Sequence, residues 1–294
     1  MYRKEKKRVR KRIFRTKINR SVGDNVFVFS LLIILAIITA LPLYLVIVNS
    51  LKPLNELWVF PPRFYVINPT LSNFRDLFSV MEDSKIPFTR YIFNTTFVTG
   101  VGTAGCVLFG SMCAYPMAKH KYPGSKFFFK LVWLSLMFSP AVTTIPTYLI
   151  VSKLNMVDSY AALILPAWGG TLSVYLMKQF IEQIPDAILE AARIDGASEY
   201  RIFWKLVMPT VRPAWLTVVL FTVQSLWSST GTSYIYSESR KTLSYALNQI
   251  LTSGVARAGV AAAASVLMMS VPICVFMFTQ SSVIETMTSS GVKE

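Results

Sequence analysis

Residues 190–209 read EAARIDGASEYRIFWKLVMP, a segment with charges of both signs and a single Gly. It lies between two of the most hydrophobic runs of the chain. A polar stretch between apolar runs of membrane-spanning length predicts a loop that leaves the bilayer and joins two spanning helices. The fold therefore depends on how many such runs the chain contains, and the function depends on what this loop is shaped to contact.

The composition around this loop is typical of a membrane protein. Of the 294 residues, 53% are hydrophobic and 15% are charged, whereas soluble domains have about 25% charged residues. The charges leave six long uncharged windows, at 25–51, 91–118, 131–152, 159–177, 213–237 and 258–284. Even the shortest window has 19 residues, which cover roughly 28 Å as a helix, close to the hydrocarbon thickness of a bilayer. We expect an all-α integral membrane protein with six transmembrane helices.

The basic residues predict which loops face the cytoplasm. The first window is much longer than the apolar core of a signal peptide, about 7–15 residues, so we expect it to be retained as a spanning helix. With the N-terminus inside, the cytoplasmic segments hold 21 of the 30 Lys and Arg residues; they are 1–25, 119–130, 178–212 and the tail. This agrees with the positive-inside rule. Both termini and the polar loop are expected in the cytoplasm.

These assignments divide the chain into a basic cytoplasmic arm at 1–25, a six-helix domain at 26–284 and a cytoplasmic tail at 285–294. The first twenty residues contain eleven basic residues and one acidic residue. Such an arm could bind nucleic acid or lie against anionic lipid, where each basic residue contributes about 1 kcal/mol. We favour lipid and expect no nucleic acid, because the arm directly precedes a spanning helix and has a single Tyr and a single Phe for base stacking.

The run GVGTAG at 100–105 matches the G-x-G-x-x-G dinucleotide fingerprint in form only. That fingerprint works on a turn between a strand and a helix, whereas this run lies inside a predicted span. Small residues that recur every four positions instead predict a face on which helix backbones come close. They are Gly102, Cys106, Gly110, Ala114 and Ala118.

The sequence offers no chemistry of catalysis or metal binding. The three cysteines, 106, 113 and 274, all fall within predicted spans, and the single histidine, His120, lies in a basic loop without carboxylate or thiol neighbours. Paired carboxylates and a Ser/His arrangement are absent as well. We expect no metal site and no enzyme activity in this chain.

Polar and aromatic side chains within the predicted spans suggest a path for a solute. No Asp, Glu, Lys or Arg lies at a span centre, which argues against a proton- or voltage-driven machine. Neutral amides, hydroxyls and indoles suit an uncharged polyol such as a sugar. The same residues could also join helices or belong to the interfacial aromatic belt. The candidates for the path are Asn94, Thr144, Tyr148, Trp168, Gln224 and Trp227.

The polar loop itself predicts two helical pieces. PDAILEAARI should form a helix with Asp186 as its N-cap, and Asp195-Gly196 should end it because Gly tolerates a left-handed exit. SEYRIFWKLVM should form a second piece before Pro209. The small side chains of Ala191 and Ala192 would let the first helix seat deeply in another protein.

This pattern resembles the cytoplasmic loop of permease subunits in binding-protein-dependent ABC importers. Their motif is E-A-A, three residues, G, nine residues and I-x-L-P. Here Glu190-Ala191-Ala192, Gly196 and Leu206-Val207-Met208-Pro209 have the same spacing. Leu206 and Met208 depart from it conservatively. Asp195 before the Gly is similar to the carbohydrate-uptake branch, such as the maltose-type six-helix subunit, and the six spans extend the resemblance over nearly the whole chain.

The resemblance implies a type I ABC importer fold in a bacterial cytoplasmic membrane and a coupling helix that inserts into an ATPase. The residues that would couple are Glu190, Ala191, Ala192, Asp195, Gly196 and Pro209. The implied partners are a second, homologous permease in a heterodimer, two ATPase subunits, an extracytoplasmic solute-binding protein, membrane lipids and an oligosaccharide substrate. The chain has no G-x-x-x-x-G-K-[ST] motif and no Gly-Lys dipeptide, so ATP and Mg would be bound by the partner ATPase.

The alternative is a self-contained channel or secondary carrier for a neutral polar solute. Such proteins have charges within the membrane or paired broken helices around an ion site. We expect neither feature from this sequence, and the importer subunit is the favoured interpretation.

Overall fold

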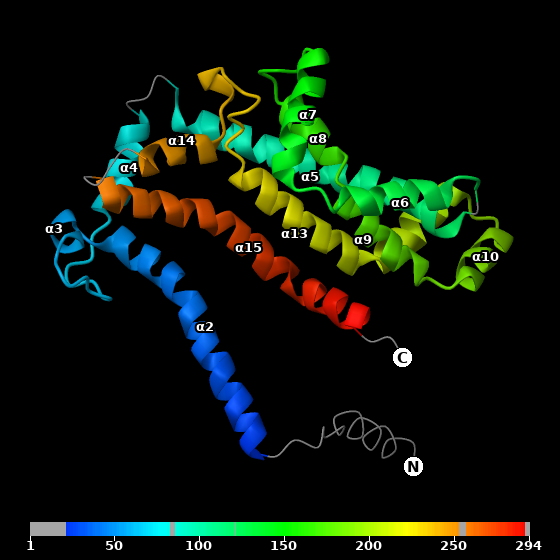
Figure 1. The fold of residues 1–294 in the computed structure, drawn as a ribbon, viewed down its shortest axis with the longest axis horizontal. Helices are drawn as coiled ribbons and strands as arrows, with labels where there is room; N and C mark the ends of the chain where they lie inside the picture. Colours follow the sequence, from blue (N-terminus) through cyan, green and yellow to red (C-terminus); the bar gives the residue numbers. More distant parts are fainter. Residues whose placement is uncertain (1–21, 83–85, 121, 253–256, 292–294) are drawn as a thin grey trace.

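The computed structural model describes residues 22–82, 86–120, 122–252 and 257–291. Every regular element in these ranges is helical, as predicted (Figure 1). The predicted basic arm lies outside the described residues except for its last four positions, where α2 (Val22–Leu51) already begins. At the other end α15 (Ala258–Gly291) continues past the end of the last predicted span at 284.

The centre of the molecule is built on α5 (Phe88–Lys119). It packs against α9 (Thr171–Glu182) and α13 (Arg212–Ser228), and α13 packs against α15 (Figure 1). A Cβ atom at Gly110 would lie 2.0 Å from Oγ of Ser173 on α9. The predicted small-residue face on this helix is therefore confirmed, and GVGTAG lies inside a helix, where a nucleotide cannot approach the backbone.

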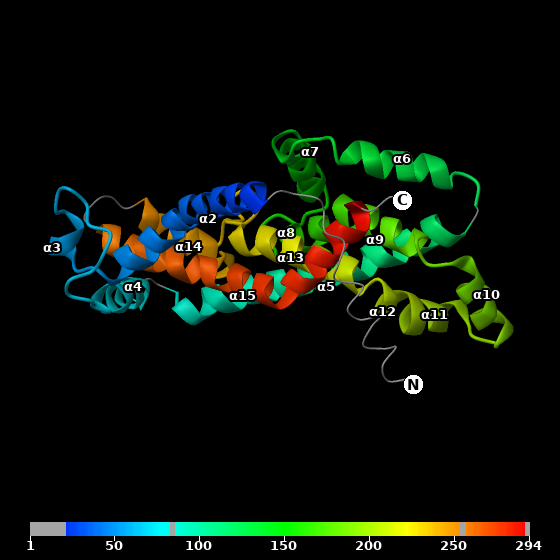
Figure 2. The same ribbon diagram turned by 90° about the horizontal axis from the view of Figure 1, so that it is seen from below.

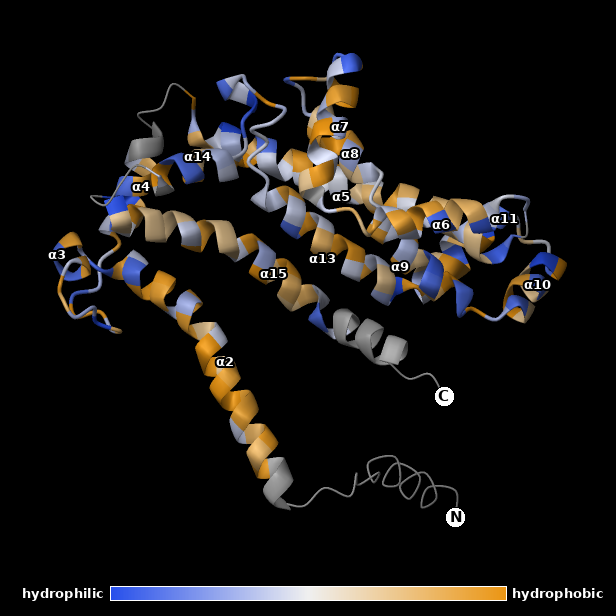
Figure 3. Cartoon of the chain, viewed as in Figure 1, coloured by the Kyte–Doolittle hydropathy of each residue, from blue (hydrophilic) through white to orange (hydrophobic). Residues whose placement is uncertain are grey.

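α2 diverges from the other helices along most of its length (Figures 1 and 3). Its side chains from Val26 to Tyr44 are exposed, and only its last turns, which include Val48 and Ser50, are buried, against α15 and α4 (Ser72–Glu82). An apolar helix with an exposed surface is suited to lipid or to another membrane helix.

Among the described residues, three helices are each long and apolar enough to cross a bilayer: Val26–Leu51, Phe88–Lys119 and Ala258–Ser281. A fourth candidate is the pair Glu199–Thr210 and Arg212–Ser228, which is bent by 76°. These correspond to the first, second, sixth and fifth predicted spans.

The third and fourth predicted spans are each broken into two helices. α6 (Ser125–Ser135) ends before α7 (Pro140–Lys153), where Ser139 caps the new helix and Pro140 lacks the N–H that a continuous helix would use. α8 (Ala161–Trp168) ends at Gly169-Gly170, since glycine is a weak helix former, and α9 follows. The third and fourth predicted spans are therefore not single helices, and the count of six crossings stays a prediction.

Several short helices lie toward the two ends of the long axis (Figures 1 and 2). One end carries α3 (Leu54–Leu57), α4 and α14 (Leu243–Leu251). The opposite end carries α10 (Asp186–Ile194), α11 (Glu199–Ile202), a π-helical turn at Phe203–Val207 and α12 (Met208–Thr210). The C-terminal end of α15 points toward the α10 end, as expected if both lie on the same side of the membrane.

Candidate functional site

The loop at 185–209 forms the predicted helix, break and second helical piece. Gly196 adopts a φ of +79°, in the left-handed region that ends α10. One detail of the prediction is wrong, because the N-cap is Pro185 and Asp186 is the first helical residue. The carboxylate of Asp186 instead pairs with Nζ of Lys119 at 2.7 Å, at the end of α5.

The two faces of α10 have different surroundings. Leu189 is 1% exposed and packs with Ile202 and Val207 of the second piece in a cluster that includes side chains of α5 and α9. On the other side Glu190 and Ile194 are exposed, with Ile194 86% exposed. Among the described residues Glu190 has no hydrogen-bond or ion-pair partner. The helix therefore presents a free, charged and apolar surface while its other face is fixed.

A buried tyrosine ties α10 and α11 to the end of α5. The hydroxyl of Tyr115 donates to Oε2 of Glu199 at 2.8 Å, and Nε of Arg193 donates to Oε1 of the same carboxylate at 2.6 Å. The bond from Arg193 holds the pKa of Glu199 below its usual value, against the effect of burial and with help from the bond from Tyr115. One carboxylate thus joins three helices.

Lys119 makes a second attachment. Its ammonium donates to the carbonyl oxygen of Glu182, the last residue of α9, and to that of Ile184, two residues later. It also pairs with Asp186. Neither attachment was predicted from the sequence, because Tyr115 and Glu199 are separated by 84 positions and Lys119 and Asp186 by 67. The only available signal was a Tyr and a Lys at the cytoplasmic end of an uncharged window.

Protonation of Glu199 is expected to loosen α10. The folded pKa lies below the ordinary value of 4.5, so the carboxylate stabilises the loop above that pH and this contribution is lost as the pH falls through the folded pKa. Hydrogen exchange at 186–202, corrected for the intrinsic rate, should therefore rise on acidification below about pH 4.5. In Glu199→Gln it should be fast throughout, with no acid-dependent rise. An identical pH response in the variant would contradict the role of Glu199.

Four of the predicted path residues are at least partly accessible. Trp168, at the break between α8 and α9, is half-buried, and its indole N–H donates to the carbonyl of Val101 at 3.2 Å. Tyr148 is half-buried and stacks on Tyr234 with ring centroids 6.4 Å apart. Thr144 and Gln224 are exposed.

The other two predicted path residues are buried and bound within the chain. Asn94 donates to the carbonyls of Ser239 and Lys241 and accepts from the hydroxyl of Tyr160 at 2.7 Å. The indole N–H of Trp227 donates to the carbonyl of Met268 at 3.0 Å. In these two cases the structure places the polar group in the packing between helices.

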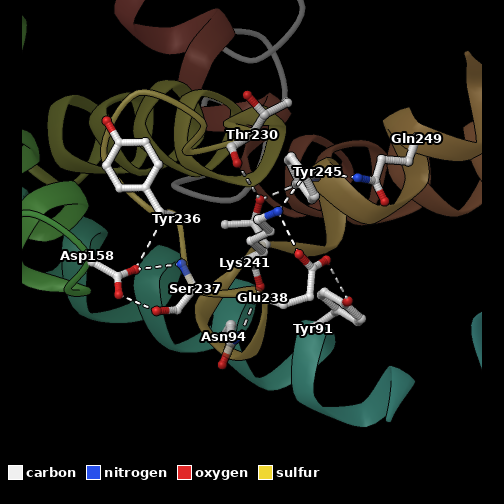
Figure 4. A network of polar contacts seen from close by, with 11 residues as sticks. Tyr91, Asn94, Asp158, Thr230, Tyr236, Ser237, Glu238, Lys241, Tyr245 and Gln249 are labelled. Atoms are coloured by element: carbon white, nitrogen blue, oxygen red, sulfur yellow. Dashed lines mark hydrogen bonds and ion pairs between the residues drawn. The ribbon is translucent and has the colours of Figure 1, made fainter. Parts of the chain in front are cut away.

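Asn94 belongs to a polar network that holds the segment before α14 (Figure 4). The carboxylate of Asp158 accepts the backbone N–H groups of Tyr236 and Ser237 at 3.1 and 2.9 Å and pairs with Arg240. Lys241 pairs with Glu238 at 2.6 Å, and Tyr91 of α5 donates to the same carboxylate; Figure 4 shows both contacts. Residues 234–242 therefore form a firmly held surface at the end opposite α10.

A cavity of about 220 Å³ lies beside the break between α8 and α9. Its lining comes from α5, α9 and α13 and from the segment between α8 and α9, and includes Cys106, Gly170, Ser173, Phe221, Thr222 and Ser225. The hydroxyl groups offer hydrogen bonds in an otherwise apolar space. Among the described residues no group of three or more His, Cys, Asp or Glu is placed to hold a metal ion.

Comparison with known families gives a match over most of the chain. Residues 106–287 match the family described as "binding-protein-dependent transport system inner membrane component". The chain is similar to Protein LplC of Bacillus subtilis (strain 168), with 34% identity over 204 residues, which are 68% of this chain and 65% of LplC. The alignment thus spans just under two thirds of that relative.

Two further similarities extend the comparison. The polygalacturonan/rhamnogalacturonan transport system permease protein YtcP of Bacillus subtilis (strain 168) is 31% identical over 212 residues, 72% of each chain. A solved bacterial ABC transporter involved in the import of the acidic polysaccharide alginate has a TM-score of 0.76 at 22% identity, covering 89% of this chain and 98% of that one. With a sequence identity of 22%, this similarity shows that the two chains share a fold.

Proposed function

The chain belongs to the binding-protein-dependent transport system inner membrane components, the multi-pass permease subunits of ABC importers in the cytoplasmic membrane, and from this premise we propose that it carries sugars or oligosaccharides. YtcP is named for polygalacturonan/rhamnogalacturonan transport, and the solved neighbour is involved in the import of alginate. The neutral hydroxyl, amide and indole groups of the predicted path would suit the hydroxyl groups and CH faces of sugar rings.

The proposed assembly contains a second, homologous permease, two ATPase subunits and an extracytoplasmic binding protein that delivers the oligosaccharide. The domain at 26–284 would cross the membrane six times, with α6–α7 and α8–α9 as broken crossings, and form half of the path. ATP and Mg would be bound by the ATPases. Closure of the ATPases would move the coupling loops and switch the spans between inward- and outward-facing states, since a ligand shifts an equilibrium by its differential affinity for the two states.

Coupling would occur through α10. Glu190, exposed and without a partner among the described residues, would pair with a basic residue of the ATPase. Ala191 and Ala192 would allow close approach, Asp195 and Gly196 would form the bend, and Pro209 would begin the return into the membrane. The observation that carries this proposal is the contrast between the free face of α10 and its fixed opposite face.

The sugar path would pass the break between α8 and α9. Trp168, Tyr148, Thr144 and Gln224 would contact the solute, and the neighbouring cavity with its hydroxyl groups would contribute to the same path. Asn94 and Trp227 would shape the path from behind, through the contacts that they make within the chain.

Replacing Glu190 by Gln is expected to reduce sugar uptake by the reconstituted importer by about tenfold or more, because a hydrogen bond to a charged group contributes about 1.5–3 kcal/mol. The side chain is exposed and has no hydrogen bond or ion pair within the described residues, so the variant should fold and assemble the spans normally. The measurement is uptake together with the affinity of the binding protein for sugar, which should not change. Asp76→Asn, which changes an exposed carboxylate of α4 that has no hydrogen bond or ion pair among the described residues, is the control and should transport normally.

A channel or secondary carrier is less well supported. Broken helices, which are typical of secondary carriers, are present in this chain. Family membership nevertheless assigns the transport to an importer complex. The two functions are distinguished by reconstituting this chain alone: flux without an ATPase would favour the channel, and preserved uptake in Glu190→Gln would count against the coupling role.

A further inference from the structure

A loop at the end opposite α10 exposes a group of large apolar side chains. This aromatic loop, residues 52–70, follows α2, contains α3 and ends before α4. Its exposed side chains are Trp58 (54%), Phe60 (92%), Phe64 (58%), Tyr65 (60%) and Ile67 (50%). Such a concentration of exposed apolar side chains usually marks a surface that contacts a protein or a membrane.

Buried charges hold the aromatic loop in shape. Glu56 is 8% exposed, and its carboxylate accepts the backbone N–H groups of Ile67 at 3.1 Å and Asn68 at 2.9 Å. Lys52 is 3% exposed, and its ammonium donates to the carbonyl of Arg63 at 2.6 Å. The N–H of Ile67 also keeps the pKa of Glu56 below its usual value. Both charged groups point inward, which leaves the apolar side chains on the outer surface.

The base of the aromatic loop is fixed to the spanning helices. The side-chain amide of Asn73, on α4, donates to the carbonyls of Ser50 at 2.9 Å and Lys52 at 2.7 Å. A Cβ at Gly259 on α15 would lie 2.3 Å from Oδ1 of Asn73. Because the scaffold is rigid, little conformational entropy is lost when the exposed side chains contact a partner.

We propose that the aromatic loop anchors this end of the permease in the interfacial layer of the bilayer, with lipid as its occupant. The loop follows directly on α2 (Figure 1), a helix whose apolar side chains are exposed from Val26 to Tyr44 and are suited to lipid before its last turns are buried. Trp and Tyr are enriched at membrane–water interfaces. The carboxylate of Glu56 accepts two backbone N–H groups within the loop, so these groups do not depend on water.

A binding protein fits this surface less well. If the chain has the proposed function, a binding protein docks and dissociates in each transport cycle. The apolar side chains of the aromatic loop would then be exposed to water again after each dissociation. Lipid covers them throughout the cycle. The loop also carries few charges on its outer surface with which a soluble partner could be recognised, since Lys52 and Glu56 are buried.

Fluorescence in nanodiscs tests the proposal. In a variant with Cys106, Cys113 and Cys274 replaced by Ala, Phe60→Cys is labelled with an environment-sensitive dye, and the lipids carry a nitroxide near the headgroup. We expect blue-shifted emission and at least about twofold quenching by the nitroxide lipid, because the dye would lie at the interface. The matched control is Tyr236→Cys, which is 57% exposed at the same end and should remain in water and unquenched.

A second measurement, of intrinsic tryptophan fluorescence, does not require the three cysteines to be replaced. Trp58→Phe should remove part of the intrinsic fluorescence that brominated lipids quench, and Glu56→Ala should reduce that quenching by loosening the loop. Equal water exposure at positions 60 and 236, or protection of position 60 only after a second permease or binding protein is added, would overturn the proposal. Neither readout requires transport, so a failure of the sugar-permease assignment would be recognised separately.

Discussion

Replacing Gly105 by Ala is expected to destabilise the helix bundle by about 1–3 kcal/mol, the usual cost of overpacking a close interior contact. The added Cβ would lie 2.0 Å from Nε1 of Trp168 on α8. That indole already donates to the carbonyl of Val101, and its ring packs at 5.0 Å from the ring of Phe109. The indole must move, and its hydrogen bond to the carbonyl of Val101 is lost.

Gly100→Ala is the matched control on the same helix. A Cβ there has no atom within 4 Å, and Ala favours a helix over Gly by about 0.5–1 kcal/mol. Thermal unfolding in nanodiscs should therefore separate the variants, with Gly105→Ala less stable and Gly100→Ala equal to or above the parent. Equal unfolding temperatures for both variants would show that α5 and α8 are not in close contact.

Gly196→Val is expected to reduce sugar uptake at least about tenfold, which corresponds to roughly 1.4 kcal/mol. The φ of +79° at Gly196 costs an ordinary residue about 1–2 kcal/mol, and a β-branched residue more. A Cβ would meet no atom within 4 Å, so the effect comes from the backbone. Relief of the strain would turn α10 away from α11 and shift the surface that is proposed to enter the ATPase.

Gly124→Val separates a specific effect from general backbone strain. Gly124 also adopts a left-handed conformation, with a φ of +91°, in the turn before α6. The Gly124→Val variant should lower the free energy of unfolding to a similar extent as Gly196→Val. It should leave the ratio of transported sugar to hydrolysed ATP unchanged. In Gly196→Val that ratio should fall. If the ratio of transported sugar to hydrolysed ATP fell equally in both variants, the turn after α10 would have no specific role in coupling.

The parts of the fold that sequence predicts well are those set by local chemistry. Long uncharged windows predicted the three single-helix candidate spans and the α13 arm of the bent pair, and Asp195-Gly196 predicted the end of α10, because charge and glycine act on the chain close to where they occur. The motif around Glu190 also led to the family. These features need no knowledge of which helix lies beside which.

The features that were missed depend on pairing between distant residues. Trp168 was predicted for the path, but its close approach to Gly105 and that of Gly170 to Cys106 were not, because these pairs are far apart in the sequence. The carboxylate of Glu199 could not be matched to Tyr115 without the structure. Asn94 was predicted for the path on its polarity alone, whereas its neighbours in space bind all of its amide.

The bend of 76° between the segment Glu199–Thr210 and α13 has a mechanical consequence. A lever whose two arms meet near a right angle converts displacement along one axis into displacement along the other. The bond network from Glu199 to α10 and α5 stiffens the short arm, and α13 is the long arm. A displacement of α10 parallel to the membrane plane would therefore tilt α13 or shift it along its axis within the bilayer.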